Sequence, residues 1–176
     1  MEAVLKSKVQ FKVLLNVMFV ISALVLPQMF HIFGMAGPVF LPMHIPVILA
    51  GLALGPVYGL LAGITSPVIS TWLTGMPAAV PMLPIMIFEL GTYGLAAGIL
   101  TKYTKLPVIL KLGITMLAGR MSYFIVYSII KAFFLPAIPA NLSVIGAIIT
   151  GLPGIVLQLI LITYMMGALN KGVKND

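Results

Sequence analysis

Long apolar segments almost without charge dominate this chain, and they constrain its fold more than any other feature. Only 7% of the 176 residues are charged, whereas a soluble domain carries about 25%. A helix needs about 20 apolar residues to cross the ~30 Å hydrocarbon core of a bilayer. The sequence therefore predicts an all-α integral membrane protein, with six transmembrane helices in a compact bundle that forms a single domain over residues 1–176. The spans are expected at roughly 11–28, 39–54, 56–73, 82–101, 107–131 and 143–169.

The basic residues predict the orientation of these spans. If the N-terminus is cytoplasmic and six spans follow, eight of the ten basic residues lie on the cytoplasmic side. Cytoplasmic loops of membrane proteins carry an excess of lysine and arginine. We therefore expect both termini in the cytoplasm, and we explain the net charge of +7 without a nucleic-acid partner. The eight residues are Lys6, Lys8, Lys12, Lys102, Lys105, Lys111, Lys171 and Lys174.

Glycines recur at every fourth position of the second and third segments, at Gly51, Gly55, Gly59 and Gly63. Residues four apart lie on one helical face, and small residues on a face allow membrane helices to approach closely. The Gly55-Pro56 pair predicts a tight turn, with the third helix starting at Pro56, because proline is favoured in the first turn of a helix. Two uses of the glycines remain open: packing within the chain, which is the commoner use, and docking of another membrane subunit.

Two ionisable side chains lie inside predicted spans. Glu89 is about 10 Å from the outer end of the fourth span and Arg120 about 16 Å from that of the fifth, at ~1.5 Å per residue. An ionisable group within the membrane is a functional candidate by default. The two depths differ by one helical turn, so a contact between the side chains is feasible. A structural pair and a ligand-binding pair are equal alternatives.

Polar and aromatic residues share a face with each of these two groups, and they predict a ligand pocket near the outer surface. Aromatic rings would stack on a flat ligand, and polar tips would orient it. Residues at the outer loops could close the pocket, although interfacial anchoring is a strong alternative for Trp72. The candidate substrate-binding residues are Glu89, Tyr93, Arg120, Tyr123, Tyr127, His31, Trp72, Asn141 and Lys131.

Motifs for several activities are missing from the sequence. It contains no phosphate-binding loop of an ATPase, no hydrolase signature and no cysteine. His31 and His44 are thirteen residues apart without nearby carboxylates, which makes a weak case for a metal site. A lone His44 in an apolar span is more often a helix–helix hydrogen-bonding residue than a ligand. We therefore predict no catalytic residues, no metal, no cofactor and no enzymatic activity, so that partner subunits would supply the energy for transport.

Two segments resemble a known family. The second-to-third span junction "PVILAGLALGPVYGLLAGITSPVIS" and the fourth span "MLPIMIFELGTYGLAAGIL" are similar to the substrate-binding (S) component of energy-coupling factor (ECF) vitamin transporters. The resemblance implies six helices, with a vitamin or precursor bound under the first, third and fifth loops. It also implies docking of helices one to three onto a membrane coupling (T) subunit, which joins two ATPases. The first span, "LLNVMFVISALV", lacks the Ala-x-x-x-Ala that the family often uses, which shifts the expected docking contact to Gly59 and Gly63.

The resemblance thus implies the substrate-binding subunit of an ATP-driven importer in a bacterial or archaeal plasma membrane. A self-sufficient channel or carrier is one alternative, against which the nearly charge-free inner half argues. An intramembrane enzyme that couples Glu89 with His31 or His44 is another. The substrate is left open: a ring fits, as does a carboxylate for Arg120. Pantothenate, a benzimidazole-type cobalamin precursor, and pyridoxine-like, folate-like and flavin ligands all remain candidates.

Overall fold

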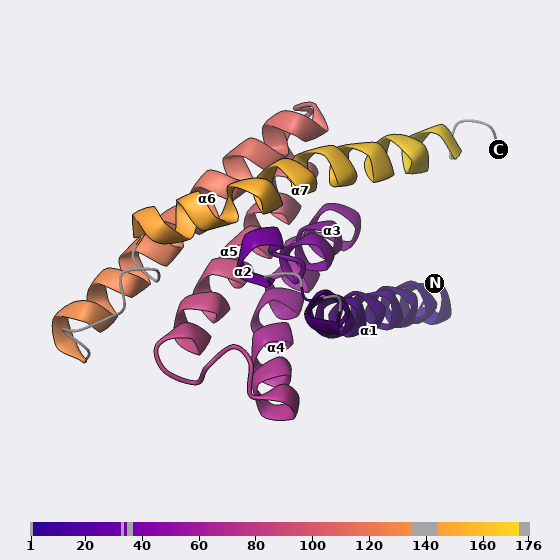
Figure 1. Cartoon of the computed structure of the whole chain (residues 1–176). Coiled ribbons are helices and arrows are strands. Elements are labelled where there is room, and N and C mark those ends of the chain that lie inside the picture. Colours follow the sequence, from indigo (N-terminus) through magenta and orange to yellow (C-terminus); the bar gives the residue numbers. More distant parts are fainter. Residues whose placement is uncertain (1, 33, 35–36, 135–143, 173–176) are drawn as a thin grey trace.

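The described part of the chain is helical. The computed structural model describes residues 2–32, 34, 37–134 and 144–172, and within these ranges it contains helices and no strands. Figure 1 shows α6 and α7 side by side, with α3 and α4 on the other side of α5 and α1 beyond them. The helices are α1 (Glu2–Ile32), α2 (Gly37–Phe40), α3 (His44–Leu54), α4 (Pro56–Thr74), α5 (Met82–Tyr103), α6 (Val108–Phe133) and α7 (Val144–Gly172).

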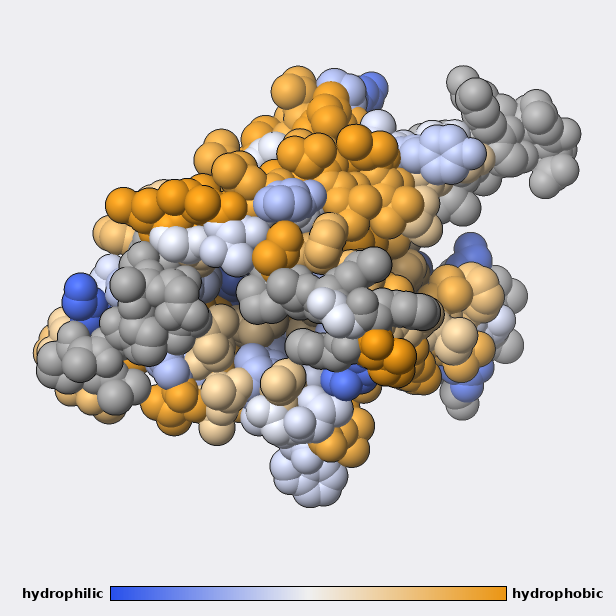
Figure 2. Space-filling model, in the orientation of Figure 1, coloured by the Kyte–Doolittle hydropathy of each residue, from blue (hydrophilic) through white to orange (hydrophobic). Residues whose placement is uncertain are grey.

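Five of these helices are long and apolar enough to cross a membrane, namely α1, α4, α5, α6 and α7. Their outward side chains are mostly large and apolar, and Figure 2 shows such side chains over much of the visible face. Water would disfavour exposing so much apolar surface, whereas lipid does not. The structure therefore supports a multi-pass membrane protein.

The second predicted span is wrong in its extent. The sequence predicted a span over 39–54, but α3 has only 11 residues, or ~16 Å at 1.5 Å per residue. The helix begins late because Pro42 disfavours the helical conformation at the residue before it, and Leu41 has a φ of 51°. Ten of the 11 residues of α3 are buried, so the other helices surround this short element.

The turn at Gly55-Pro56 is confirmed. Helix α3 ends at Leu54 and α4 begins at Pro56, which allows only a single residue between two helices. Gly55 has a φ of 101°, a conformation that residues with a side chain rarely adopt. Glycine and proline therefore act together here: one permits the sharp turn and the other starts the next helix.

The glycines of α4 pack inside the chain, against α5. A Cβ atom on Gly59 would lie 2.6 Å from the carbonyl carbon of Gly94, and one on Gly63 would lie 2.6 Å from the backbone nitrogen of Gly91. Both glycines are buried. Of the two uses that the sequence left open for Gly59 and Gly63, the structure shows packing within the chain, because α5 lies against that face. Their small size brings the backbones of α4 and α5 into contact.

Candidate ligand-binding site

A cavity of about 410 Å³ lies at the end of the bundle where α4 is connected to α5. The late start of α3 at His44 helps to form the cavity. Residues 41–43 do not continue the helix and instead line the cavity wall. Most of the lining is apolar, as is typical of small-molecule sites. The lining residues are Pro27, Gln28, Leu41, Pro42, Met43, His44, Ser70, Met76, Pro77, Ala78, Met82, Met86, Glu89, Arg120, Tyr123, Ala147 and Thr150.

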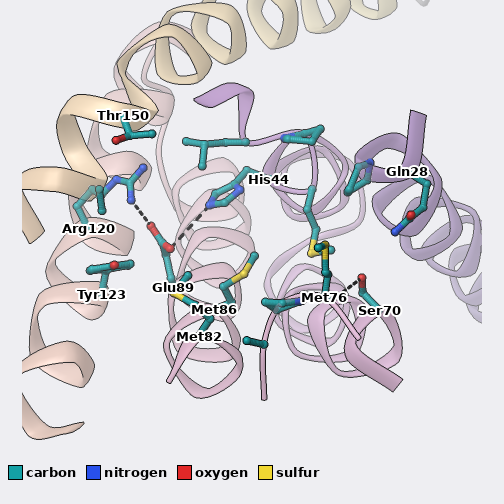
Figure 3. Close-up of a pocket in the computed structure, with 17 residues that line it drawn as sticks. Gln28, His44, Ser70, Met76, Met82, Met86, Glu89, Arg120, Tyr123 and Thr150 are labelled. Carbon is teal, nitrogen blue, oxygen red and sulfur yellow. Dashed lines mark hydrogen bonds and ion pairs between the residues drawn. The ribbon is translucent and has the colours of Figure 1, made fainter. Parts of the chain in front are cut away.

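An ion pair between α5 and α6 occupies one side of this cavity. Arg120 Nη1 lies 2.8 Å from Glu89 Oε1, and only 13% and 3% of the two side chains are exposed. The other carboxylate oxygen, Oε2, lies 3.8 Å from His44 Nε2 of α3. Figure 3 shows the Glu89 carboxylate between the other two side chains. The contact anticipated between Glu89 and Arg120 is thus present, and His44 adds a third polar group.

Several polar atoms of this cluster keep unused hydrogen-bonding capacity. Within the described ranges, neither ring nitrogen of His44 has a hydrogen-bond partner, and the same holds for Arg120 Nε and Nη2. These atoms are buried, and a buried polar group without a partner costs free energy. A bound molecule that met these atoms would recover that cost, so the cluster is well suited to hold the polar part of a ligand.

Aromatic rings pack against the polar cluster. Tyr93, which is only 2% exposed, donates a long hydrogen bond from its hydroxyl to Glu89 Oε1 at 3.5 Å. Its ring and that of His44 are in T-shaped contact, with 5.2 Å between the ring centroids. Tyr123 lines the cavity and stacks on Tyr127 at 6.2 Å with an angle of 13° between the ring planes. The rings therefore fix the positions of the polar side chains.

The connection between α4 and α5 is tied to the end of α4, and this forms another wall. Ser70 Oγ donates to the carbonyl oxygen of Met76 at 2.6 Å, and Thr71 Oγ1 donates to that of Pro77 at 2.8 Å. Both hydroxyls thus donate hydrogen bonds to backbone carbonyls that lie outside a helix and have no intrahelical donor. The two bonds hold Met76 and Pro77 at the cavity, where both line it.

The structure brings together some of the predicted site residues and not others. Glu89, Arg120 and Tyr123 line the cavity, while Tyr93 and Tyr127 lie behind them. Trp72 is 89% exposed and Lys131 is also exposed; neither of them lines the cavity. Asn141 and the side chain of His31 lie outside what the structure describes.

Sequence reasoning missed His44, Gln28 and the methionines of the cavity. His44 was interpreted as a helix–helix hydrogen-bonding residue within a span, but it is the first residue of α3 and lies at the cavity. The available signal was Pro42, two residues upstream, which moves the start of the helix. Methionines are common in apolar spans, and no local pattern marks those at positions 43, 76, 82 and 86.

Comparison with known proteins identifies the family. The family model for the substrate-specific component of ECF transporters matches residues 12–166, which includes the whole described cavity. No curated protein and no solved structure matches the chain significantly. The family is one of transporter subunits that bind a substrate and associate with coupling and ATPase components, and it is not a family of enzymes. With most of its length matched, the chain belongs to the substrate-specific components of ECF transporters.

Proposed function

We propose that this protein is the high-affinity binding subunit of an ATP-driven importer for a water-soluble vitamin or vitamin precursor. Family membership supports a substrate-specific membrane subunit. The observation that carries the finer proposal is the cavity of about 410 Å³ with Glu89, Arg120 and His44 on one side. Its volume falls within the range of sites for small ligands, about 300–1,000 Å³.

We place the mouth of this cavity on the outer side of the membrane. Helix α5 starts near the cavity at Met82 and ends at Tyr103, with Lys102 in its last turn and Lys105 in the connection that follows. Lysines mark the cytoplasmic side, so the opposite end of α5 faces outward. The ligand would then enter from outside, between the end of α1 and the connection between α4 and α5.

Binding would proceed without any chemical change of the ligand. The polar cluster would orient one end of the molecule, and the apolar wall would enclose the rest. Displacing water from the cavity lowers the local dielectric constant and strengthens each remaining polar contact. A membrane coupling subunit and two ATPases would then supply the energy for release on the inner side.

Docking onto the coupling subunit would use the open surfaces of α1 and α4. The resemblance pointed to helices one to three, but α3 is enclosed and the glycine face of α4 is covered by α5. Most of the span in α1 is exposed, and α4 presents a row of apolar residues on its outer side. That row consists of Val57, Leu61, Ile64 and Val68.

Ligand binding by the purified protein tests the proposal. Tyr123 is 3% exposed at the cavity, whereas its neighbour Phe124 is 49% exposed on the other face of α6. In a screen of vitamins and precursors, one compound should bind in a 1:1 ratio. The substitution Tyr123→Leu should weaken that compound at least tenfold, and the matched Phe124→Leu should leave it within twofold.

Transport assays separate this function from a self-sufficient channel or carrier. Liposomes that contain this chain alone should show no flux of the bound compound, and uptake should require the coupling subunit, both ATPases and ATP. Flux through the isolated chain would refute the importer role and support the alternative.

A further inference from the structure

The charges at the cavity cancel one another. Among the described lining residues, Glu89 is the one acid and Arg120 the one strong base, and they are paired at 2.8 Å. Adding a net charge to a largely apolar cavity costs free energy unless the site provides an opposite charge. A charged ligand would have to break the pair or remain unbalanced. The cavity is therefore matched to a guest without ionised groups.

The unused hydrogen-bonding atoms indicate what the polar end of such a guest looks like. In the region that the structure covers, Arg120 Nε and Nη2 are donors without a partner and would take a carbonyl or ring-nitrogen acceptor. Glu89 Oε2, 3.8 Å from His44 Nε2, would take an N–H or O–H. The two ring nitrogens of His44, also without a partner in that region, offer further hydrogen-bonding positions. The guest would thus present an acceptor next to a donor, as an amide-like ring edge does.

The rest of the lining indicates a flat, polarizable body. Four methionines, Met43, Met76, Met82 and Met86, reach the cavity together with the ring of Tyr123. Thioether sulfurs make favourable contacts with aromatic rings and adapt to irregular shapes. In Figure 3, labelled methionines lie between the ion pair and Gln28, which projects from α1 on the opposite side of the view. Gln28 adds a second polar contact that again carries no charge.

Resting on the proposed function, we infer that the substrate is an uncharged molecule with a flat heteroaromatic ring, whose edge presents an adjacent acceptor and donor to Arg120, Glu89 and His44. The methionines and Tyr123 cover the faces of the ring, and Gln28 contacts its far end. The intact ion pair acts as a single neutral recognition group and not as an anchor for a carboxylate.

The first test identifies the molecule that the protein carries. The full chain is purified from membranes in mild detergent, its bound small molecule is released by heat, and the molecule is identified by mass spectrometry. A molecule that is uncharged at pH 7 and has a ring with an amide-like edge supports the inference. A carboxylate, phosphate, amine or zwitterion overturns it and leaves the binding function intact.

A panel of matched pairs measures the charge preference directly. Each pair contains an acid and its uncharged counterpart: nicotinate and nicotinamide, pantothenate and pantothenol, biotin and biotinamide. In any pair that binds, the uncharged member should bind at least tenfold more tightly, and equal or tighter binding of the acid overturns the inference. If no molecule is released from the protein and no probe or vitamin binds, the proposed function fails as well.

Charge variants provide a sign-specific control. Glu89→Gln leaves the charge of Arg120 unbalanced, so the preference should shift at least tenfold toward the acid of each pair. Arg120→Gln should shift it away from the acid. The double variant Glu89→Gln/Arg120→Gln restores a net charge of zero and should keep the preference for uncharged probes even if a single variant fails to fold. An unchanged preference in a folded single variant overturns the inference.

Discussion

Replacing Gly59 with alanine should separate α4 from α5. The added Cβ would lie 2.6 Å from the carbonyl carbon of Gly94 and 2.7 Å from the Cα of Gly51, and it would be closer still to the carbonyl oxygen of Gly94. Favourable contacts between carbon atoms begin near 3.5 Å, so the backbones must move apart by at least about 0.9 Å. All three opposing atoms belong to the backbone, so a change of side-chain rotamer cannot relieve the clash.

The expected cost of Gly59→Ala is therefore near the upper end of overpacking effects, about 3 kcal/mol of unfolding free energy. The gain in helix propensity from glycine to alanine, about 1 kcal/mol, lowers the net loss to about 2 kcal/mol. Reversible unfolding of the purified protein by SDS in mixed micelles measures this difference. Ligand affinity should fall too, because α5 carries Glu89.

Two other glycines provide matched controls. A Cβ on Gly91 of α5 would meet only side-chain atoms at 3.3 and 3.5 Å, and one on Gly113 of α6 would meet nothing within 4 Å. Gly91→Ala should therefore cost less than about 1 kcal/mol, and Gly113→Ala should be neutral or stabilising. Equal effects at Gly59 and Gly113 would refute the close approach of α4 and α5.

Three further predictions concern the ion pair, the exposed tryptophan and the orientation. Glu89→Gln and Arg120→Gln should each lower the unfolding free energy by about 3–5 kcal/mol, because each leaves a buried charge unpaired. The double variant should lose less unfolding free energy than either single variant. If the two single effects simply add in the double variant, the pairing is contradicted. Trp72→Ala should leave ligand affinity within twofold, and a tenfold loss would place Trp72 in the site after all. Since the chain has no cysteine, single introduced cysteines can report its orientation. A maleimide that does not cross the membrane should label Ala79→Cys but not Lys105→Cys on intact cells. The reverse labelling pattern would show that the proposed orientation is wrong.

The sequence was sufficient for the long helices, because their signal is repeated over many residues. Four helices, α4 to α7, begin and end within a few residues of the predicted spans, since apolar runs and the prolines at 56 and 107 mark them. Prediction from the sequence failed at α3, because the apolar run continues through Pro42 whereas the helix begins only at His44. Composition cannot distinguish an apolar helix from the apolar turn at 41–43 that precedes it.

The candidate site was only partly predictable for a related reason. Glu89 and Arg120 are conspicuous because charge is rare in a span, and helical rise alone places them at compatible depths. The position of His44 depends on where α3 starts, and that of Gln28 on how the end of α1 leans over the cavity. Such packing between distant segments leaves no periodic trace in the sequence, and so Trp72 and Lys131 were favoured over residues that line the cavity.

The late start of α3 limits the size of the ligand that the cavity can hold. If α3 continued upward through residues 41–43, its extra turn would occupy the volume that those residues now border. The length of one enclosed helix thus limits the space that is left for the ligand. Related chains could accept smaller or bulkier compounds simply by moving the proline that delays this helix.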